Sequence, residues 1–196
     1  MILWAALRLE DYPVVNIENN AKRAKVLIGI TQTIDAEVSR ITGLASRWDG
    51  TVAMIGDAYE CGYWGAKDYS CYVEYAEQVA DNRLLRISNP IHEMLHAHSV
   101  GYNMIAYPVF SEYEEGVVEH LTRIIRGEIT GNLGEDPETD FSSIDQKTGY
   151  DNEMKFMESL RIKTGKEPRD FYLQLIRINL ISRESVVKQW IAENQK

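Results

Sequence analysis

A five-residue motif with two histidines, His92-Glu93-Met94-Leu95-His96, constrains this chain more than any other feature. On a helix, residues four positions apart lie one turn above each other on the same face, so both imidazoles can reach a single metal ion. Glu93 stands next to the first histidine, where its carboxylate can reach a water molecule on that metal. The spacing therefore predicts a helix that carries two zinc ligands, His92 and His96, with Glu93 within reach of a water molecule on the metal.

A catalytic zinc site takes three protein ligands and keeps a fourth position for water, so one ligand must come from elsewhere in the chain. Glu115 is the candidate, because the 18 residues that separate it from His96 leave room for a turn and a returning helix. Glu119, one turn further on, can hydrogen-bond the far nitrogen of a liganding histidine. Glu112 and Glu114 remain alternatives to Glu115 if the turn is built differently.

The pattern HExxH, eighteen residues, then Glu-Gly, with an acid four residues later, resembles the gluzincin zinc metallopeptidases. The resemblance is to their aminopeptidase-type, peptidase-MA-like branch. It implies a zincin-like fold, Zn²⁺ as the cofactor and a peptide or protein as the substrate. It also implies that His92, His96 and Glu115 bind the metal, that Glu93 is the general base, and that Glu119 supports a ligand from behind.

Two other segments extend this resemblance to about half of the chain. Gly65-Ala66-Lys67-Asp68 is similar to the edge strand on which aminopeptidases of this branch hold the peptide backbone, which assigns Gly65 and Ala66 to substrate binding. That family strand reads Gly-Ala-Met-Glu-Asn, so the departures after Ala66 leave exopeptidase and endopeptidase activity both open. Tyr150 is similar to the family tyrosine that stabilises the tetrahedral oxyanion, with Tyr107 as the alternative.

Two other functions are compatible with the same motif. A non-catalytic module would keep zinc for folding, and the run HExLHxxS followed by EEG has a fainter similarity to protease-like segments of phage head-morphogenesis proteins. A purely structural site has no use for Glu93 beside the metal, which favours an enzyme. A zinc hydrolase of non-peptide amides would need the same residues as a peptidase, and the sequence does not separate the two.

The hydrophobic pattern predicts an α+β fold. It has a small, mostly antiparallel sheet, an active-site helix that carries the HExxH motif, and a helical C-terminal half. Strands are expected at 51–58 and 70–75, and helices at 19–42, 90–99, 111–126, 150–164, 168–180 and 182–194. We expect one domain over residues 1–196. Within it, 1–129 hold the sheet and the zinc-binding helices, 130–149 form a surface loop, and 150–196 form a helical subdomain.

The net charge and the remaining residues limit the kinds of partner that the protein can have. Acidic residues outnumber basic ones by 30 to 21, so we expect no nucleic acid partner. The apolar start, residues 1–7, is too short for a membrane span and lacks the features of a secretory peptide, which predicts a cytoplasmic protein without a membrane partner. Cys61 and Cys71 are expected to be reduced. His98 and His120 are both expected to lie off the metal face. For His98 we expect a position that is either exposed or behind the ligands.

Overall fold

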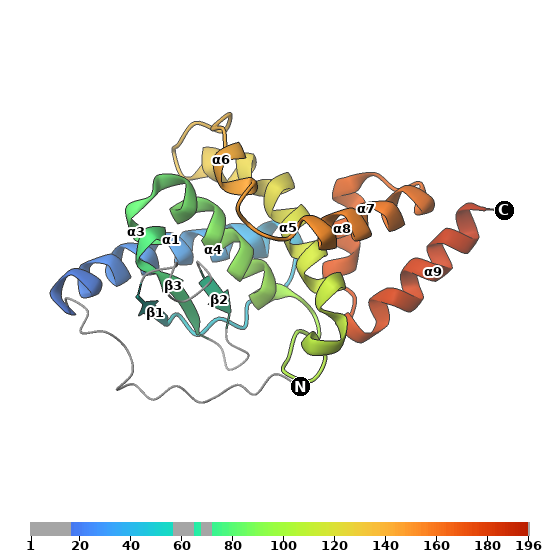
Figure 1. The fold of residues 1–196 in the computed structure, drawn as a ribbon, viewed down its shortest axis with the longest axis horizontal. Coiled ribbons are helices and arrows are strands. Elements are labelled where there is room, and N and C mark those ends of the chain that lie inside the picture. The colour runs from blue at the N-terminus through green and yellow to red at the C-terminus, as the bar shows by residue number, and fades with distance from the viewer. Residues whose placement is uncertain (1–16, 57–64, 68–71, 196) are drawn as a thin grey trace.

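The structure, a computed structural model, describes residues 17–56, 65–67 and 72–195 and combines many helices with one small sheet (Figure 1). The helices are α1 (Ile17–Thr42), α3 (Glu77–Asp81), α4 (Arg83–His98), α5 (Tyr107–Asn132), α6 (Ser142–Asp145), α7 (Asp151–Thr164), α8 (Pro168–Ile176), the 3-10 helix η2 (Leu180–Ser182) and α9 (Arg183–Asn194). The strands are β1 (Val52–Ile55), β2 (Gly65–Lys67) and β3 (Val73–Ala76). This composition agrees with the expected α+β class.

The sheet is mixed, so the prediction of a mostly antiparallel sheet is wrong. Its strand order is β1-β3-β2. β3 runs parallel to β1, with Val52 opposite Val73, and antiparallel to β2, with Gly65 opposite Tyr75. The chain reverses direction twice between β1 and β3, and β3 then takes the central position. The spacing of the strands in the sequence does not predict that β3 lies between β1 and β2. This order depends on which strand pairs with the edge of β1.

The helix that carries the histidine motif starts at Arg83, seven residues before the predicted start. Its cap is Asn82, whose side chain accepts hydrogen bonds from the main-chain nitrogens of Leu84 and Leu85. Pro90 lies inside the helix and costs it one main-chain hydrogen bond. The helix continues through it because its apolar residues are buried on both sides of the proline, at positions that include Leu85, Ile87, Ile91 and Met94.

The second motif helix, α5, is also longer than predicted. Regular helix begins at Ser111, as predicted, because Phe110 has non-helical backbone angles (φ −121°, ψ 24°) and separates an additional first turn. The predicted stop at Gly127 is wrong, since the helix continues to Asn132. The carbonyl oxygen of Pro137 lies 3.1 Å from where a Cβ of residue 127 would be, so this glycine provides space for the returning chain.

The segment 130–149 is more ordered than the predicted surface loop. It contains the end of α5 and the short helix α6, and it buries Phe141 and Ile144 in the core. The predictions for α1, α7 and α9 are confirmed within two residues at each end. The predicted helix 168–180 ends earlier, at Ile176, and η2 follows it.

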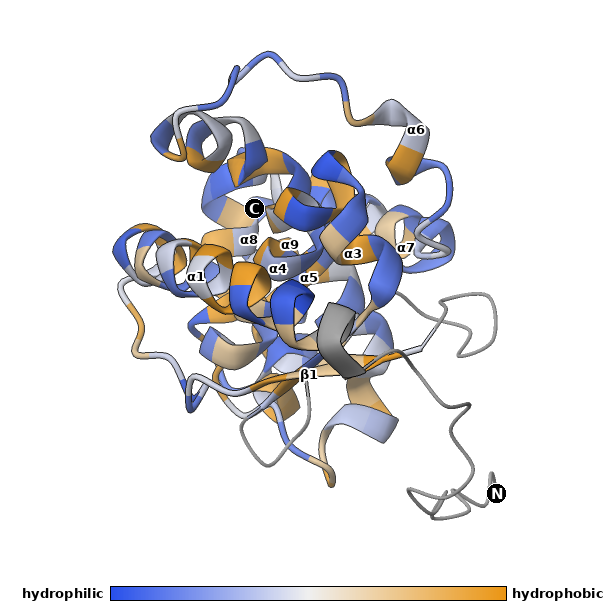
Figure 2. Ribbon diagram, turned by 90° about the vertical axis from the view of Figure 1, so that its left-hand side faces the viewer, coloured by the Kyte–Doolittle hydropathy of each residue, from blue (hydrophilic) through white to orange (hydrophobic). Residues whose placement is uncertain are grey.

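The core lies where α1, α4, α5 and α8 meet. α4 packs against α1 on one side and against α5 on the other, and α5 also contacts α7 and α8. Figure 2 shows hydrophobic and hydrophilic residues alternating along the helices, a pattern typical of helices with one buried face. Fully buried members include Leu27, Ile34, Met94, Leu95, Leu121, Ile125, Phe171 and Leu175. None of the helices in the described part of the chain is both long and apolar enough to span a bilayer.

Candidate metal centre

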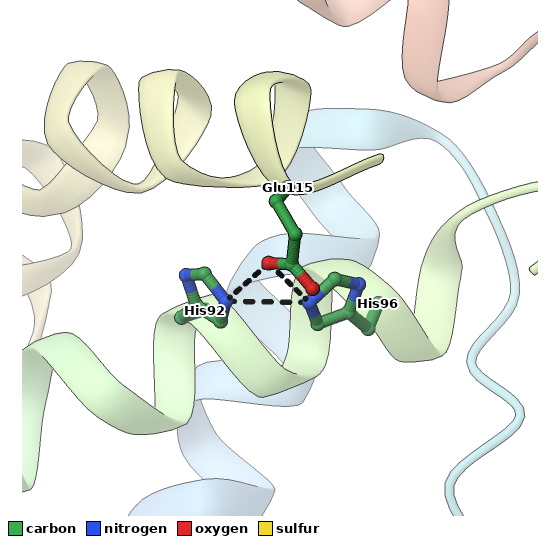
Figure 3. Close-up of side chains that lie close together, drawn as sticks. All are labelled: His92, His96 and Glu115. Carbon is green, nitrogen blue, oxygen red and sulfur yellow. Dashed lines mark hydrogen bonds and ion pairs between the residues drawn. The ribbon is translucent and has the colours of Figure 1, made fainter. Parts of the chain in front are cut away.

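Three buried side chains converge where α4 faces α5: His92 and His96 from α4, and Glu115 from α5 (Figure 3). The Nε2 atoms of the two imidazoles are 3.2 Å apart. Oε2 of Glu115 lies 3.3 Å from Nε2 of His92 and 3.4 Å from Nε2 of His96. The three atoms form a nearly equilateral triangle, so a single metal ion could contact all of them.

Two further carboxylates contact the opposite sides of the imidazoles. Oε2 of Glu119 lies 3.1 Å from Nδ1 of His92. Oε1 of Glu114 lies 2.8 Å from Nδ1 of His96. When each Nδ1–H donates to its carboxylate, each Nε2 keeps its lone pair and becomes a possible ligand. The structure therefore places Glu119 behind a histidine and gives the same position to Glu114 on the other histidine.

The position of Glu114 corrects its interpretation as an alternative metal ligand. Its carboxylate faces Nδ1 of His96, away from the triangle, and it also accepts hydrogen bonds from Ser99 and Arg183. Glu112, the other alternative, is exposed. One sequence signal could have suggested the role of Glu114, because consecutive helical residues point about 100° apart. If Glu115 faces the metal, Glu114 must flank it.

The carboxylates dominate the electrostatics of the metal-free cluster. Burial lowers the pKa of His96, but the charge of Glu115 together with the hydrogen bond and charge of Glu114 outweighs burial and raises that pKa to about 9. Burial also opposes protonation of His92, and Glu115 and Glu119 raise its pKa well above the usual range. Burial would raise the pKa of Glu115, yet the two imidazoles hold it far below its usual value. A cation that binds here must displace protons.

The two oxygens of Glu115 have different environments. The hydroxyl of Tyr107 donates to Oε1 at 2.5 Å. Oε2 is buried and has no hydrogen-bond partner among the described residues, although it faces both Nε2 atoms. Buried polar atoms are nearly always satisfied, so this oxygen is available to a cation that the two imidazole nitrogens could also contact.

Tyr150 lies beside the triangle, at the N-terminal end of α7. Its ring stacks on the imidazole of His92, with the centroids 5.1 Å apart. Gly116 allows α7 to approach α5, since a Cβ at this position would lie 2.4 Å from Cγ of Met157 and 2.8 Å from the carbonyl oxygen of Glu153. The glycine after Glu115 thus helps to place Tyr150.

Glu93 is buried on the same helix as the two histidines. Its charge adds to the effects that raise the pKa of His92, and it also acts on Tyr150. Burial is the main reason why the pKa of Tyr150 is raised, and the charge of Glu115 adds to it. Tyr150 is therefore a neutral hydroxyl and a possible hydrogen-bond donor.

The segment that the sequence assigns to substrate binding, Gly65 and Ala66, lies along α4, the helix of the histidine motif. Gly65 and Ala66 are in β2, the edge strand beside β3. A Cβ on Gly65 would lie 2.4 Å from Oδ1 of Asn89 in α4, three residues before His92, so a larger residue here would force the Asn89 side chain to move. Asp68, Cys61 and Cys71 lie outside the described residues.

The two other histidines lie outside the triangle. Nδ1 of His98 is 2.8 Å from the carbonyl oxygen of Met94, and its Nε2 is 3.8 Å from Oδ1 of Asp35 in α1. His98 is thus buried between helices, neither exposed nor behind a ligand as expected, because α1 covers this face of α4. Nε2 of His120 lies 3.0 Å from the carbonyl oxygen of Met154, away from the metal face as expected.

Comparisons of the chain with protein-family models, with curated proteins and with solved structures gave no match.

Proposed function

We propose that the protein is a zinc-dependent metallopeptidase whose metal is held by His92, His96 and Glu115. The triangle of possible ligand atoms carries this proposal. Zinc binds histidine nitrogen and carboxylate oxygen at about 2.0 to 2.2 Å in tetrahedral geometry, which puts neighbouring ligand atoms about 3.3 Å apart. The three separations here are 3.2, 3.3 and 3.4 Å. Three ligands on one face of a tetrahedron leave the fourth position for water or substrate.

The charges around the triangle also support a bound cation. Glu114 forms an ion pair with Arg183, and Glu119 forms one with Arg123. Among the described residues, Glu115 contacts two imidazoles and a tyrosine but no arginine or lysine. A buried carboxylate needs a positive partner. A divalent metal would supply it when the imidazoles are neutral, as they must be to act as ligands.

The residues around the triangle fit peptide-bond hydrolysis. A zinc ion bound there would polarise a scissile carbonyl group and lower the pKa of a water molecule. Glu93 would take a proton from the water and pass it to the leaving amine. The neutral hydroxyl of Tyr150 would donate a hydrogen bond to the oxyanion that develops on the carbonyl oxygen.

The strand β2 supports a peptide over other amides as the substrate. It is at the edge of the described sheet, and only one of its sides pairs with β3. An extended peptide can add to such an edge by main-chain hydrogen bonds. Because β2 packs close to α4 at Gly65, a peptide along this edge would run beside the helix that carries Glu93.

The proposal is tested by zinc analysis together with digestion of a broad peptide library. We expect about one zinc ion per chain and peptide cleavage by the wild-type protein. Glu93→Gln should keep the zinc and the fold but lower cleavage by about 100-fold or more, since an amide cannot accept the proton. Glu112→Gln is the matched control, because Glu112 is an exposed acid of α5, and it should cleave normally.

Each other outcome contradicts a separate part of the proposal. Bound zinc without cleavage of any peptide would assign the site to a structural module. Cleavage of small acylated amides alone would assign a non-peptide amidase. Equal turnover by Glu93→Gln and the wild type would exclude Glu93 as the general base.

A further inference from the structure

The first residue of α9, Arg183, is completely buried and extends from the C-terminal helices to the histidine cluster. Its Nη1 donates to Oε2 of Glu114 at 2.6 Å, and its Nη2 donates to Oγ of Ser99 at 2.5 Å. Its Nε donates to the carbonyl oxygen of Ile178 at 3.3 Å. A buried charge of this size is expensive to desolvate, and it is retained here in contact with a carboxylate that touches a possible metal ligand.

Glu114 divides its two oxygens between Arg183 and His96. Oε2 accepts from Arg183 and, at 2.8 Å, from the hydroxyl of Ser99. Oε1 is the atom that lies 2.8 Å from Nδ1 of His96. The two donors on Oε2 fix the plane of the carboxylate, and the remaining oxygen is thereby directed at the imidazole.

We infer that Arg183 is a positioning residue of the metal centre, which anchors Glu114 so that the imidazole of His96 presents Nε2 to the triangle. The inference rests on the proposed function in one respect, that His96 is a metal ligand. It means that the affinity for the metal depends on α9. This helix begins 87 residues after His96 in the sequence.

A comparison with His92 shows why the dependence on α9 is specific to His96. Glu119, which contacts Nδ1 of His92, is anchored by Arg123 at 2.7 Å, four residues later on the same helix. That anchor is local, and α5 alone can form it. The anchor of Glu114 has to come from another helix, so the packing of α9 affects the orientation of His96 and leaves that of His92 unchanged.

Substitution of Arg183 tests the inference if zinc affinity and stability are measured separately. Arg183→Met removes the charge and keeps the unbranched, mostly apolar part of the side chain, and Arg183→Lys restores a charged donor. Arg161→Met is the control, because Arg161 is a partly buried arginine of the C-terminal helices whose described partners, Glu158 and Lys166, lie outside the cluster. Zinc affinity is measured by competition with a chelator, and stability by urea unfolding of the metal-free protein.

We expect Arg183→Met to weaken zinc binding by about 10- to 100-fold, the usual effect of removing a residue that orients a ligand. Arg183→Lys should recover most of the affinity, and Arg161→Met should bind zinc like the wild type. All variants are compared in buffer where the urea curves show them folded. Equal zinc affinity of Arg183→Met and Arg161→Met would overturn the inference.

A double variant keeps the test decisive if Arg183→Met does not fold. Glu114→Gln combined with Arg183→Met leaves no buried charge without a partner, so this protein should fold and still bind zinc at least about 10-fold more weakly than the wild type. Wild-type affinity in the double variant would overturn the inference. Failure of both variants to fold would assign Arg183 to the fold alone and would overturn it as well.

The wild-type protein distinguishes this inference from the proposed function. If the wild type binds zinc and Arg183→Met binds it equally well, only the inference fails. If the wild type binds zinc but cleaves no peptide, the proposed function fails and the effect of Arg183 on affinity stands. If the wild type binds no zinc, both fail.

Discussion

The Nδ1 atom of His92 lies 3.1 Å from Oε2 of Glu119, one helical turn after Glu115. One helix therefore supplies both a possible metal ligand and the carboxylate that orients another ligand. Arg123 binds the second oxygen of Glu119 at 2.7 Å, and its Nη2 also donates to Oγ1 of Thr148, two residues before Tyr150. The orientation of His92 is thus linked to the segment that carries Tyr150.

Replacing Glu119 by alanine should weaken zinc binding by about 10- to 100-fold without abolishing it, since the imidazole of His92 loses the acceptor that fixes its tautomer. A chelator competition measures the change, and Glu112→Ala is the control. An unchanged dissociation constant would show that Glu119 does not support the ligand. Complete loss of zinc would mean that Glu119 is the ligand and that Glu115 has the supporting role.

Replacing Glu115 by glutamine should remove tight zinc binding, because a neutral amide oxygen is a poor substitute for a carboxylate ligand. The side chain keeps its size, and Tyr107 can still donate to the amide oxygen, so the fold should persist. Elemental analysis after zinc supplementation measures the loss, with circular dichroism as the check on folding. Full zinc content in this variant would exclude Glu115 as a ligand.

Tyr150→Phe and Tyr107→Phe should have different effects. The Tyr150 variant keeps the ring that stacks on His92, so zinc content should persist while kcat falls by about 100-fold with little change in KM. The Tyr107 variant loses the hydroxyl that donates to Glu115, so its main effect should be on zinc affinity. Steady-state kinetics and chelator competition on both proteins separate the roles. A loss of kcat only in the Tyr107 variant would transfer the oxyanion role to that residue.

Zinc affinity should increase with pH. The pKa of His96 is raised to about 9 in the metal-free protein and that of His92 is also raised well above its usual value, so a zinc ion must compete with protons for the two imidazoles. Both must lose a proton to act as ligands, so the dissociation constant should fall by up to about 100-fold per pH unit from pH 6 to 8. Chelator competition at several pH values, corrected for the chelator's own protonation, measures this slope. A dissociation constant independent of pH would contradict the assignment of both histidines.

Residues close together in the sequence gave the most reliable predictions. His92 and His96 share a helix face because four residues make about one turn, and the same geometry places Glu119 one turn beyond Glu115. These relationships require only that the two segments be helical. The spacing of the histidine motif indicated the first helix, and the apolar pattern over 111–126 indicated the second.

Only the tertiary structure decided where the helices end and which distant residues meet. A glycine often ends a helix, but α5 continues past Gly127. The chain returning at Pro137 packs against α5 at this position, where a side chain would leave it little space. Arg183 contacts Glu114 across 69 residues because α9 folds back on the cluster. Helix geometry fixes distances over a few residues, whereas long-range contacts depend on how whole surfaces pack, and the sequence carries no local signal for them.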